Sequence, residues 1–186
     1  MTNKVNQRAL GNNIRQSTGD MYNDCTIHKA PESGIRQLIL KLQERISNEP
    51  AAGKFIEDLS DFMKPRPNRE IIGLENKLVA GGREDEVDDA EYLKLKFSKR
   101  LVADELSESV QVVYAHILAY INSTFALIVK PLIRDGQSHA AIDGKVYEQI
   151  VDPIYNDVAL ADIGITADHI RGMLYYLTGN CYVRWH

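Results

Sequence analysis

Cysteine is scarce in this chain of 186 residues: Cys25 and Cys181 are the only two, and they lie near opposite ends. A chain of this length buries enough surface to fold without disulfides or a structural metal. The opening residues Met1-Thr2-Asn3-Lys4 lead into polar sequence and not into the apolar segment of a secretory signal. We therefore expect a reduced, cytoplasmic protein.

Recognisable catalytic motifs are also missing. A phosphate-binding glycine loop is absent, because Gly81-Gly82 is followed by Arg83 and a run of acids that would repel phosphate. No serine or cysteine stands in a known nucleophile motif, and His116, alone among apolar residues, is typical of a hydrogen-bonded core histidine. We expect no catalytic residue, no cofactor and no enzymatic activity, although the sequence leaves open a site assembled from distant residues.

Two cysteine and histidine pairs make one conceivable zinc set, namely Cys25 with His28 and Cys181 with His186. In extended segments, spacings of three and five residues place the members of each pair on opposite faces, and the two pairs are far apart in the chain. We therefore predict no metal site, and ordinary thiols and surface histidines instead.

An excess of positive charge is lacking too, since the formal net charge is -4 at pH 7. This balance disfavours free nucleic acid as the main partner. A local exception is the basic cluster of Lys94, Lys96, Lys99 and Arg100. It supports an alternative interpretation, a small helical regulator that binds nucleic acid, but nearby acids such as Glu91 and Asp104 are able to neutralise it. The acid-rich segment from Glu84 to Glu91 is equally able to attract a basic protein.

Charged side chains are absent from Ser109 to Val129, a stretch about as long as a membrane span. Seven polar or amphipathic residues interrupt it: Gln111, Tyr114, His116, Tyr120, Asn122, Ser123 and Thr124. A lipid-facing helix would leave these groups without partners, so we predict a buried central helix and no membrane association. Pro131 is expected to kink or end this helix, and Asp135-Gly136 to close it.

From Ser33 onward the apolar residues recur with the period of helices. Apolar residues recur every three or four positions in the first two segments: Ile35, Leu38, Ile39, Leu42 and Ile46, then Phe55, Ile56, Leu59, Phe62 and Met63. Pro65-Arg66-Pro67 separates them from a third helix that we expect Asn68 to cap and Gly81-Gly82 to end. A fourth helix follows, with acids in its first turns and a core face of Val87, Ala90, Leu93, Phe97 and Leu101.

Two more helices are expected beyond the central one. The first runs from about Val146 to Val158 and is bent or interrupted by Pro153. We therefore predict an all-α fold, a single compact multi-helix domain of residues 31–186 around the central apolar helix. Residues 1–30 differ in composition, and either a polar arm or a short β-hairpin fits them.

The last helix and its tail form the most distinctive part of the sequence. Thr166 is able to cap a helix with an apolar face of Ile170, Met173, Leu174 and Leu177, and Gly179-Asn180 to supply a left-handed exit. The chain then continues as an extended tail to Trp185. A tryptophan on so short a tail is expected to anchor it, either in this domain or in a partner.

The run from Gly172 to Cys181, with the closing Trp185, resembles the end of the C-terminal domains of bacterial ABC-three-component systems, and Leu10 to Asp20 is similar to segments that precede such domains. The resemblance implies a non-enzymatic docking or adaptor subunit of an antiphage defence assembly. The implied partners are an ABC-type ATPase, a middle component and a separate effector protein. The implied contact residues are Tyr175, Tyr176, Asn180, Tyr182, Arg184 and Trp185.

Overall fold

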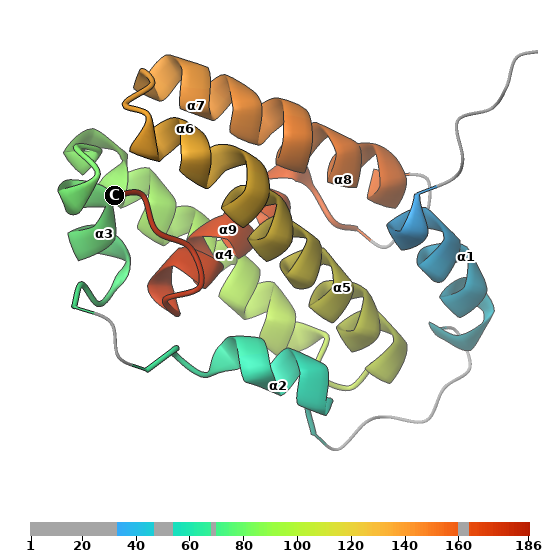
Figure 1. The fold of residues 1–186 in the computed structure, drawn as a ribbon. Helices are drawn as coiled ribbons and strands as arrows, with labels where there is room; N and C mark the ends of the chain where they lie inside the picture. The colour runs from blue at the N-terminus through green and yellow to red at the C-terminus, as the bar shows by residue number, and fades with distance from the viewer. Residues whose placement is uncertain (1–32, 47–53, 68–69, 160–163) are drawn as a thin grey trace, which may run out of the picture. The chain divides into compact units, whose positions relative to one another are not determined.

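The computed structural model describes residues 33–46, 54–67, 70–159 and 164–186. Within these ranges the chain forms seven continuous helices and no strand, which confirms the predicted all-α class (Figure 1). The predicted arm or hairpin of residues 1–30 lies outside the described residues, so this feature and the boundary after it stay predictions.

Three short helices open the described part of the chain: α1 Gly34–Ile46, α2 Glu57–Met63 and α3 Leu74–Ala80. The first helix buries Ile35, Ile39 and Leu42, as its periodicity predicts. The prediction that α3 starts at a cap on Asn68 is wrong. Gly73, with φ 88°, immediately precedes Leu74, and this left-handed backbone prevents a helix from passing through it.

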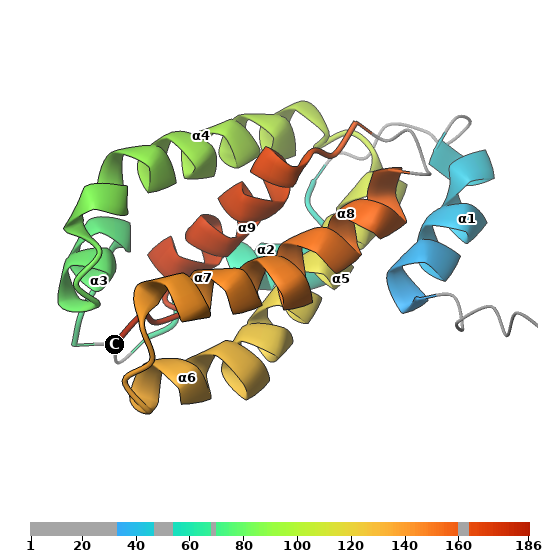
Figure 2. The ribbon, with the colours of Figure 1, turned by 90° about the horizontal axis from the view of Figure 1, so that it is seen from above.

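Helix α4 Val87–Ala103 packs along the last helix, α9 Ala167–Gly179, after a 3-10 turn of the acidic residues Glu84–Glu86 (Figure 2). The two backbones approach so closely at Gly172 that a Cβ there would lie 2.4 Å from the Leu93 carbonyl oxygen. The predicted cap is confirmed: the Thr166 side chain accepts from the His169 backbone N–H, and the His169 ring accepts in return from the Thr166 N–H.

The central helix is confirmed as a core element. It comprises α5 Glu108–Thr124, a π-helical turn Phe125–Val129 and α6 Lys130–Arg134, and it packs against α1, α2 and α9. As a helix of 27 residues, Glu108–Arg134 is long and apolar enough to cross a membrane, but half of its most apolar window is buried inside the protein. That burial is the expected property of a core helix.

A second long helix repeats this construction, with α7 His139–Val146, a π-helical turn Tyr147–Val151 and α8 Asp152–Val158. In each case the π turn ends two residues before a proline, Pro131 or Pro153. Proline lacks an N–H and clashes with the carbonyl four residues earlier, and the wider π turn relieves both problems. The prolines therefore interrupt the α-helical ladder as predicted, but neither ends its helix.

The chain leaves α9 through a left-handed residue, but not the one that the sequence predicts. Asn180 keeps a negative φ of -85°, whereas Cys181 has φ 66°. The Tyr182 N–H then donates to the Leu177 carbonyl (2.9 Å) and the Cys181 N–H to the Thr178 carbonyl (3.1 Å). This is the Schellman pattern, in which the left-handed residue is the one after the C-cap, a place usually taken by glycine.

Candidate interaction groove

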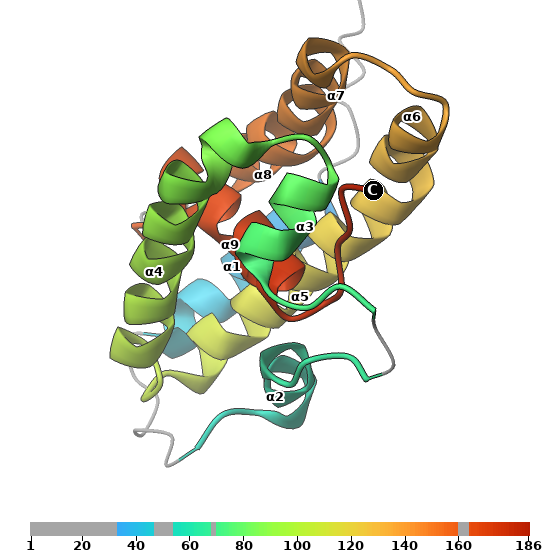
Figure 3. The ribbon, with the colours of Figure 1, turned by 90° about the vertical axis from the view of Figure 1, so that its left-hand side faces the viewer.

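The C-terminal tail passes between α3 and α6 (Figure 3), and Trp185 anchors it in its own domain. The side chain is only 4% exposed, and its ring contacts Phe125 edge-on with centroids 5.0 Å apart. The indole N–H donates to Thr178 Oγ1 (3.2 Å), while the buried Arg83 guanidinium lies 4.6 Å above the ring. Of the two alternatives that the sequence allows, the structure therefore selects the intramolecular anchor.

The other five residues implied by the resemblance differ in their surroundings. Tyr175 is buried, and Tyr176 is half-buried with its ring edge-on to Phe97 at 5.3 Å. The Asn180 amide donates to the Phe62 carbonyl (2.9 Å). Tyr182 and Arg184 are half-buried as well, and they line two adjoining hollows on the surface, whereas Tyr175 lines a separate hollow with Trp185.

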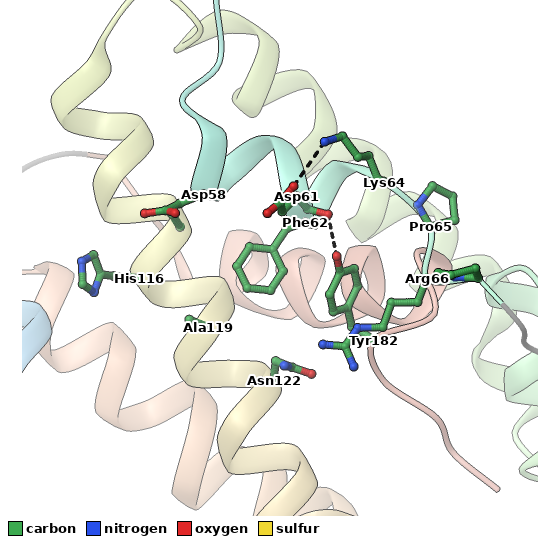
Figure 4. Close-up of a pocket in the computed structure, with 12 residues that line it drawn as sticks. Asp58, Asp61, Phe62, Lys64, Pro65, Arg66, His116, Ala119, Asn122 and Tyr182 are labelled. Carbon is green, nitrogen blue, oxygen red and sulfur yellow. Dashed lines mark hydrogen bonds and ion pairs between the residues drawn. The ribbon is translucent and has the colours of Figure 1, made fainter.

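The larger hollow is an open groove of about 690 Å³ between α2 with its following segment and the exposed side of α5 (Figure 4). Its lining residues come from three separate parts of the chain: Asp58, Asp61, Phe62, Lys64, Pro65, Arg66 and Pro67; Ala115, His116, Ala119 and Asn122; and Tyr182. Small alanines on α5 leave the space open, while Phe62 and the prolines supply an apolar wall.

Tyr182 fixes one wall of this groove to the C-terminal tail. Its ring packs on Phe62 with centroids 5.1 Å apart, and its hydroxyl donates to the Asp61 carbonyl. The Arg66 guanidinium lies 4.4 Å above the same ring, and the Arg66 N–H donates to the Asn180 carbonyl (3.0 Å). The tail thus holds the segment after α2 in place through the aromatic ring of Tyr182 and the backbone and amide of Asn180.

His116 is exposed and lines the groove, so the expectation of a core histidine is wrong. It lies on the solvent side of α5, between the buried Ala115 and Ile117. The expectation rests on the apolar sequence neighbourhood of His116, which does not determine which side of a helix a residue occupies. Nearby, Lys64 pairs with Asp61 (3.2 Å), and both side chains are well exposed, so the pair contributes little to stability.

A smaller hollow of about 180 Å³ continues the groove toward α6. It shares Arg66, Asn122 and Tyr182 with the first and adds Phe125, Ala126, Lys130 and Arg184. Within the part of the chain that the structure describes, no ion pair joins Arg66, Lys130 or Arg184 to a carboxylate. We call the two hollows together the interaction groove; its α6 end is cationic and its α2 end contains the acids Asp58 and Asp61.

The four residues of the predicted basic cluster do not gather on one surface. Lys94 pairs with Glu91 (3.0 Å) and lies beside Gly179, whereas Lys96, Lys99 and Arg100 line a hollow with Tyr92 and Leu95.

Acidic partners neutralise much of the remaining charge of this cluster. Lys96 pairs with Asp168 (2.6 Å), a contact that raises the pKa of the lysine and lowers that of the carboxyl, and Arg100 pairs with Asp104 (2.5 Å). Lys99 is exposed and belongs to no ion pair within the described ranges. Nucleic-acid binding here stays a prediction, with little unpaired charge to support it.

Cys25 and His28, half of the conceivable zinc set, lie outside the described residues, which contain no group of three potential metal ligands. Cys181 is buried, and its Sγ accepts a hydrogen bond from Lys77 Nζ (3.1 Å). The fully buried Lys77 also donates to the Thr178 carbonyl, at the negative end of α9.

Sequence reasoning missed the two buried cations that hold the tail. Lys77 is fully buried, and Arg83, only 1% exposed, pairs with Glu86 (2.5 Å) and Asp143 (2.7 Å) while it covers Trp185. Lysine and arginine usually lie at the surface, so no local signal distinguishes these two from the chain's other cations. Arg66 lies between two prolines, and the sequence indicates for this segment only a break between helices.

Comparison with known families gives a match over residues 73–185 to C-terminal domain 9 of the ABC-three component (ABC-3C) systems. The match begins at Gly73, before α3, and ends at Trp185, so it includes α5 and the tail but not α2 and the segment after it. Searches of curated proteins and of solved structures gave no match. Because the match covers more than half of the chain, the chain belongs to the family of C-terminal domain 9 of the ABC-three component systems.

Proposed function

We propose that this chain is a non-enzymatic docking subunit that binds another component of an ABC-three-component system through the interaction groove. Family membership supports a role among these components. The choice of this surface rests on the contacts of Tyr182. Tyr182 lies within the matched domain, and it holds the segment after α2, which lies outside the matched residues, against that domain. The groove is thus built jointly by the family domain and by a segment outside the matched residues.

The chemistry of the groove suits a protein segment. Phe62, Pro65 and Ala119 offer apolar contact, and Arg66 and Arg184 offer charge-assisted hydrogen bonds to carboxylates. A segment with an apolar side chain followed by acidic ones would satisfy both parts. The carboxylates of Asp58 and Asp61 at the α2 end would repel the phosphate backbone of a nucleic acid, so they disfavour nucleic acid as the occupant of the groove. In this proposal the partners are the ATPase, the middle component or the effector of a cytoplasmic bacterial defence assembly, and any ATP hydrolysis belongs to them.

Co-purification with the neighbouring gene products tests the proposal. We expect the tagged chain to retain an ABC-type ATPase or another component of the system. Ala119→Arg fills the groove, and Arg66→Glu with Arg184→Glu reverses its cationic end. Each change should weaken capture at least about tenfold, because it acts on contacts that the complex desolvates. Thermal melting should be unchanged for Ala119→Arg, whose site is exposed.

Matched controls separate the groove from general surface effects. Ala141→Arg places the same side chain at an exposed alanine on α7, and Lys41→Glu reverses an exposed charge on α1; neither residue lines the groove. Both should leave capture unchanged. Capture that survives Ala119→Arg and the Arg66/Arg184 reversal would exclude the groove as the docking surface, and failure of every component to co-purify would exclude the adaptor role.

A further inference from the structure

The side of α4 that faces away from the domain carries exposed apolar residues. Tyr92, Leu95 and Val102 are 63%, 52% and 63% exposed, and Leu106, just after the helix, is 61% exposed. The opposite side of the helix buries Ala90, Leu93, Phe97 and Leu101. Helix α4 lies at the edge of the described elements, with α9 on one side only (Figures 2 and 3). No described element covers these residues.

The exposed residues form a regular seam. Asp88, Tyr92, Leu95, Lys99 and Val102 follow one another at alternating steps of four and three residues, the spacing of the contact positions of a coiled coil. We call these five residues the outer α4 face. Scattered surface apolar residues need no explanation, but an ordered heptad seam opposite the buried side indicates a surface that packs on another helix.

The charges on this seam are self-complementary. The midpoint between Asp88 and Lys99 along the helix coincides with the midpoint between Tyr92 and Leu95. When two copies of α4 pack antiparallel about that point, Tyr92 of each meets Leu95 of the other, and Asp88 of each meets Lys99 of the other. A parallel pair would instead place Asp88 against Asp88 and Lys99 against Lys99.

We infer that the outer α4 face binds a second copy of this chain in an antiparallel, two-fold symmetric contact. A surface with an unlike partner has no need of such internal symmetry, whereas an isologous contact requires it. Asp88 and Lys99 are both exposed, and neither belongs to an ion pair within the described ranges. The hollow of about 350 Å³ beside Tyr92, Leu95 and Lys99 receives the aromatic ring of the second copy.

This contact goes beyond the proposed docking role and is separable from it. The outer α4 face shares no residue with the interaction groove. A dimer formed through α4 therefore leaves both grooves unoccupied by the dimer contact. Such a dimer would present two grooves, and a partner assembly with two docking segments would bind it more tightly than one groove alone, without any additional type of contact.

Sedimentation equilibrium of the purified full chain tests the inference through charge reversal. We expect the wild type to form dimers, and Leu95→Asp to abolish them. Asp88→Lys alone and Lys99→Asp alone should each raise the dimer dissociation constant about tenfold or more, because each dimer contains the altered pair twice. The double variant, which restores opposite charges across the axis, should return to within about threefold of the wild type.

Two single charge changes elsewhere serve as controls, Glu75→Lys on α3 and Lys41→Asp on α1, both at exposed positions. They should leave the dissociation constant unchanged. All substitutions are at exposed residues, and circular dichroism checks that each variant is folded. A wild type that stays monomeric at its highest soluble concentration overturns the inference. The inference is also overturned if the single charge reversals leave the dimer dissociation constant unchanged, or if the double variant dimerises as weakly as either single variant.

Discussion

Gly81 lies directly against the backbone of Trp185: a Cβ built on Gly81 would be 2.6 Å from the Trp185 carbonyl oxygen and 3.0 Å from its Cβ. Gly81 is also the residue at which α3 ends, with an unexceptional φ of -90°. Its identity is therefore required by the close approach of the tail and not by its own backbone conformation. The end of α3 and the end of the chain are fitted to each other.

Gly81→Ala should lower the free energy of unfolding by about 1 to 3 kcal/mol, because the added methyl group meets backbone atoms that have little room to move. Urea unfolding measures the loss. Gly144→Ala in α7 is the matched control, since nothing lies within 4 Å of a Cβ at Gly144. That change should stabilise the protein by about 0.5 to 1 kcal/mol through helix propensity. Equal responses of the two variants would contradict the tail contact.

Trp185→Ala should cost about 3 to 5 kcal/mol of unfolding free energy, because the ring is almost fully buried. Trp185→Phe keeps an aromatic ring next to Phe125 and below Arg83, and loses the hydrogen bond to Thr178, so it should cost less than the alanine variant. Chemical unfolding ranks the three proteins. An alanine variant that unfolds like the wild type but no longer binds its partner would place the anchor in the partner instead.

The His169 cap predicts a pH dependence of stability. Its Nδ1 accepts the Thr166 N–H (3.1 Å), a role that requires the neutral ring. Burial, helped by the nearby Lys96 and Arg100, lowers the pKa of His169 below its ordinary 6.5. The folded state therefore binds fewer protons than the unfolded state in this range. The cap therefore makes its full contribution to the free energy of unfolding above pH 6.5, and this contribution declines as the pH falls through the lowered pKa of His169.

Urea unfolding at neutral and mildly acidic pH measures this contribution. His169→Gln supplies a side chain that suits the same capping position and does not titrate, so its stability should fall less on acidification than that of the wild type. His116→Gln, at an exposed histidine on α5, is the control and should leave the pH response as it is. If His169→Gln and wild type lose equal stability on acidification, the cap does not contribute to it.

The apolar helix Glu108–Arg134 should not bring the chain into membranes. Its buried side already contacts α1, α2 and α9, so we expect the protein to be recovered after lysis without detergent. Ultracentrifugal fractionation of cells that express the chain at low level checks this. Recovery confined to the membrane fraction would show that the helix meets lipid and not its neighbours.

The purified chain alone should neither hydrolyse ATP nor cleave DNA. The sequence contains no phosphate-binding glycine loop, and the described residues contain no cluster of three potential metal ligands. Steady-state phosphate release and plasmid cleavage are the measurements. Turnover that follows the protein through successive columns would contradict the non-enzymatic role.

Local signals located most of the helices from the sequence. The apolar period of α4 and α9, the cap at Thr166 and the end at Asp135-Gly136 all depend on residues within a few positions of one another. The predicted start of α3 is wrong because asparagine is a favourable N-cap residue in general, whereas the positive φ of Gly73 determines where this helix begins. Glycine and asparagine are likewise the residues that most often adopt the left-handed conformation after a helix, so the sequence predicts it at Gly179-Asn180, although Cys181 adopts it.

The groove was not predictable in the same way. Its walls meet through the contacts of Asn180 with Phe62 and of Tyr182 with Asp61, pairs that are 118 and 121 residues apart. Periodicity reports which side of a helix is apolar but not which segment covers it. Tyr182 and Arg184 are therefore predicted contact residues only through the family resemblance, and the sequence offers no reason to place Arg66 beside them.

The two π turns explain an unusual repeat in the apolar residues. Every fourth residue is buried in both long helices: Val113, Ile117, Ile121, Phe125 and Val129, and Ile142, Val146, Ile150, Ile154 and Val158. Four residues of an α-helix advance about 40° beyond a full turn, so such a repeat would drift from core to solvent within five positions. A π turn holds one extra residue and cancels much of this drift. Deleting the exposed Leu127 from its π turn would therefore shorten the helix while its far end still faces the core, although Pro131 would then meet the carbonyl clash that the π turn relieves. A deletion elsewhere in the same helix rotates everything beyond it by about 100°.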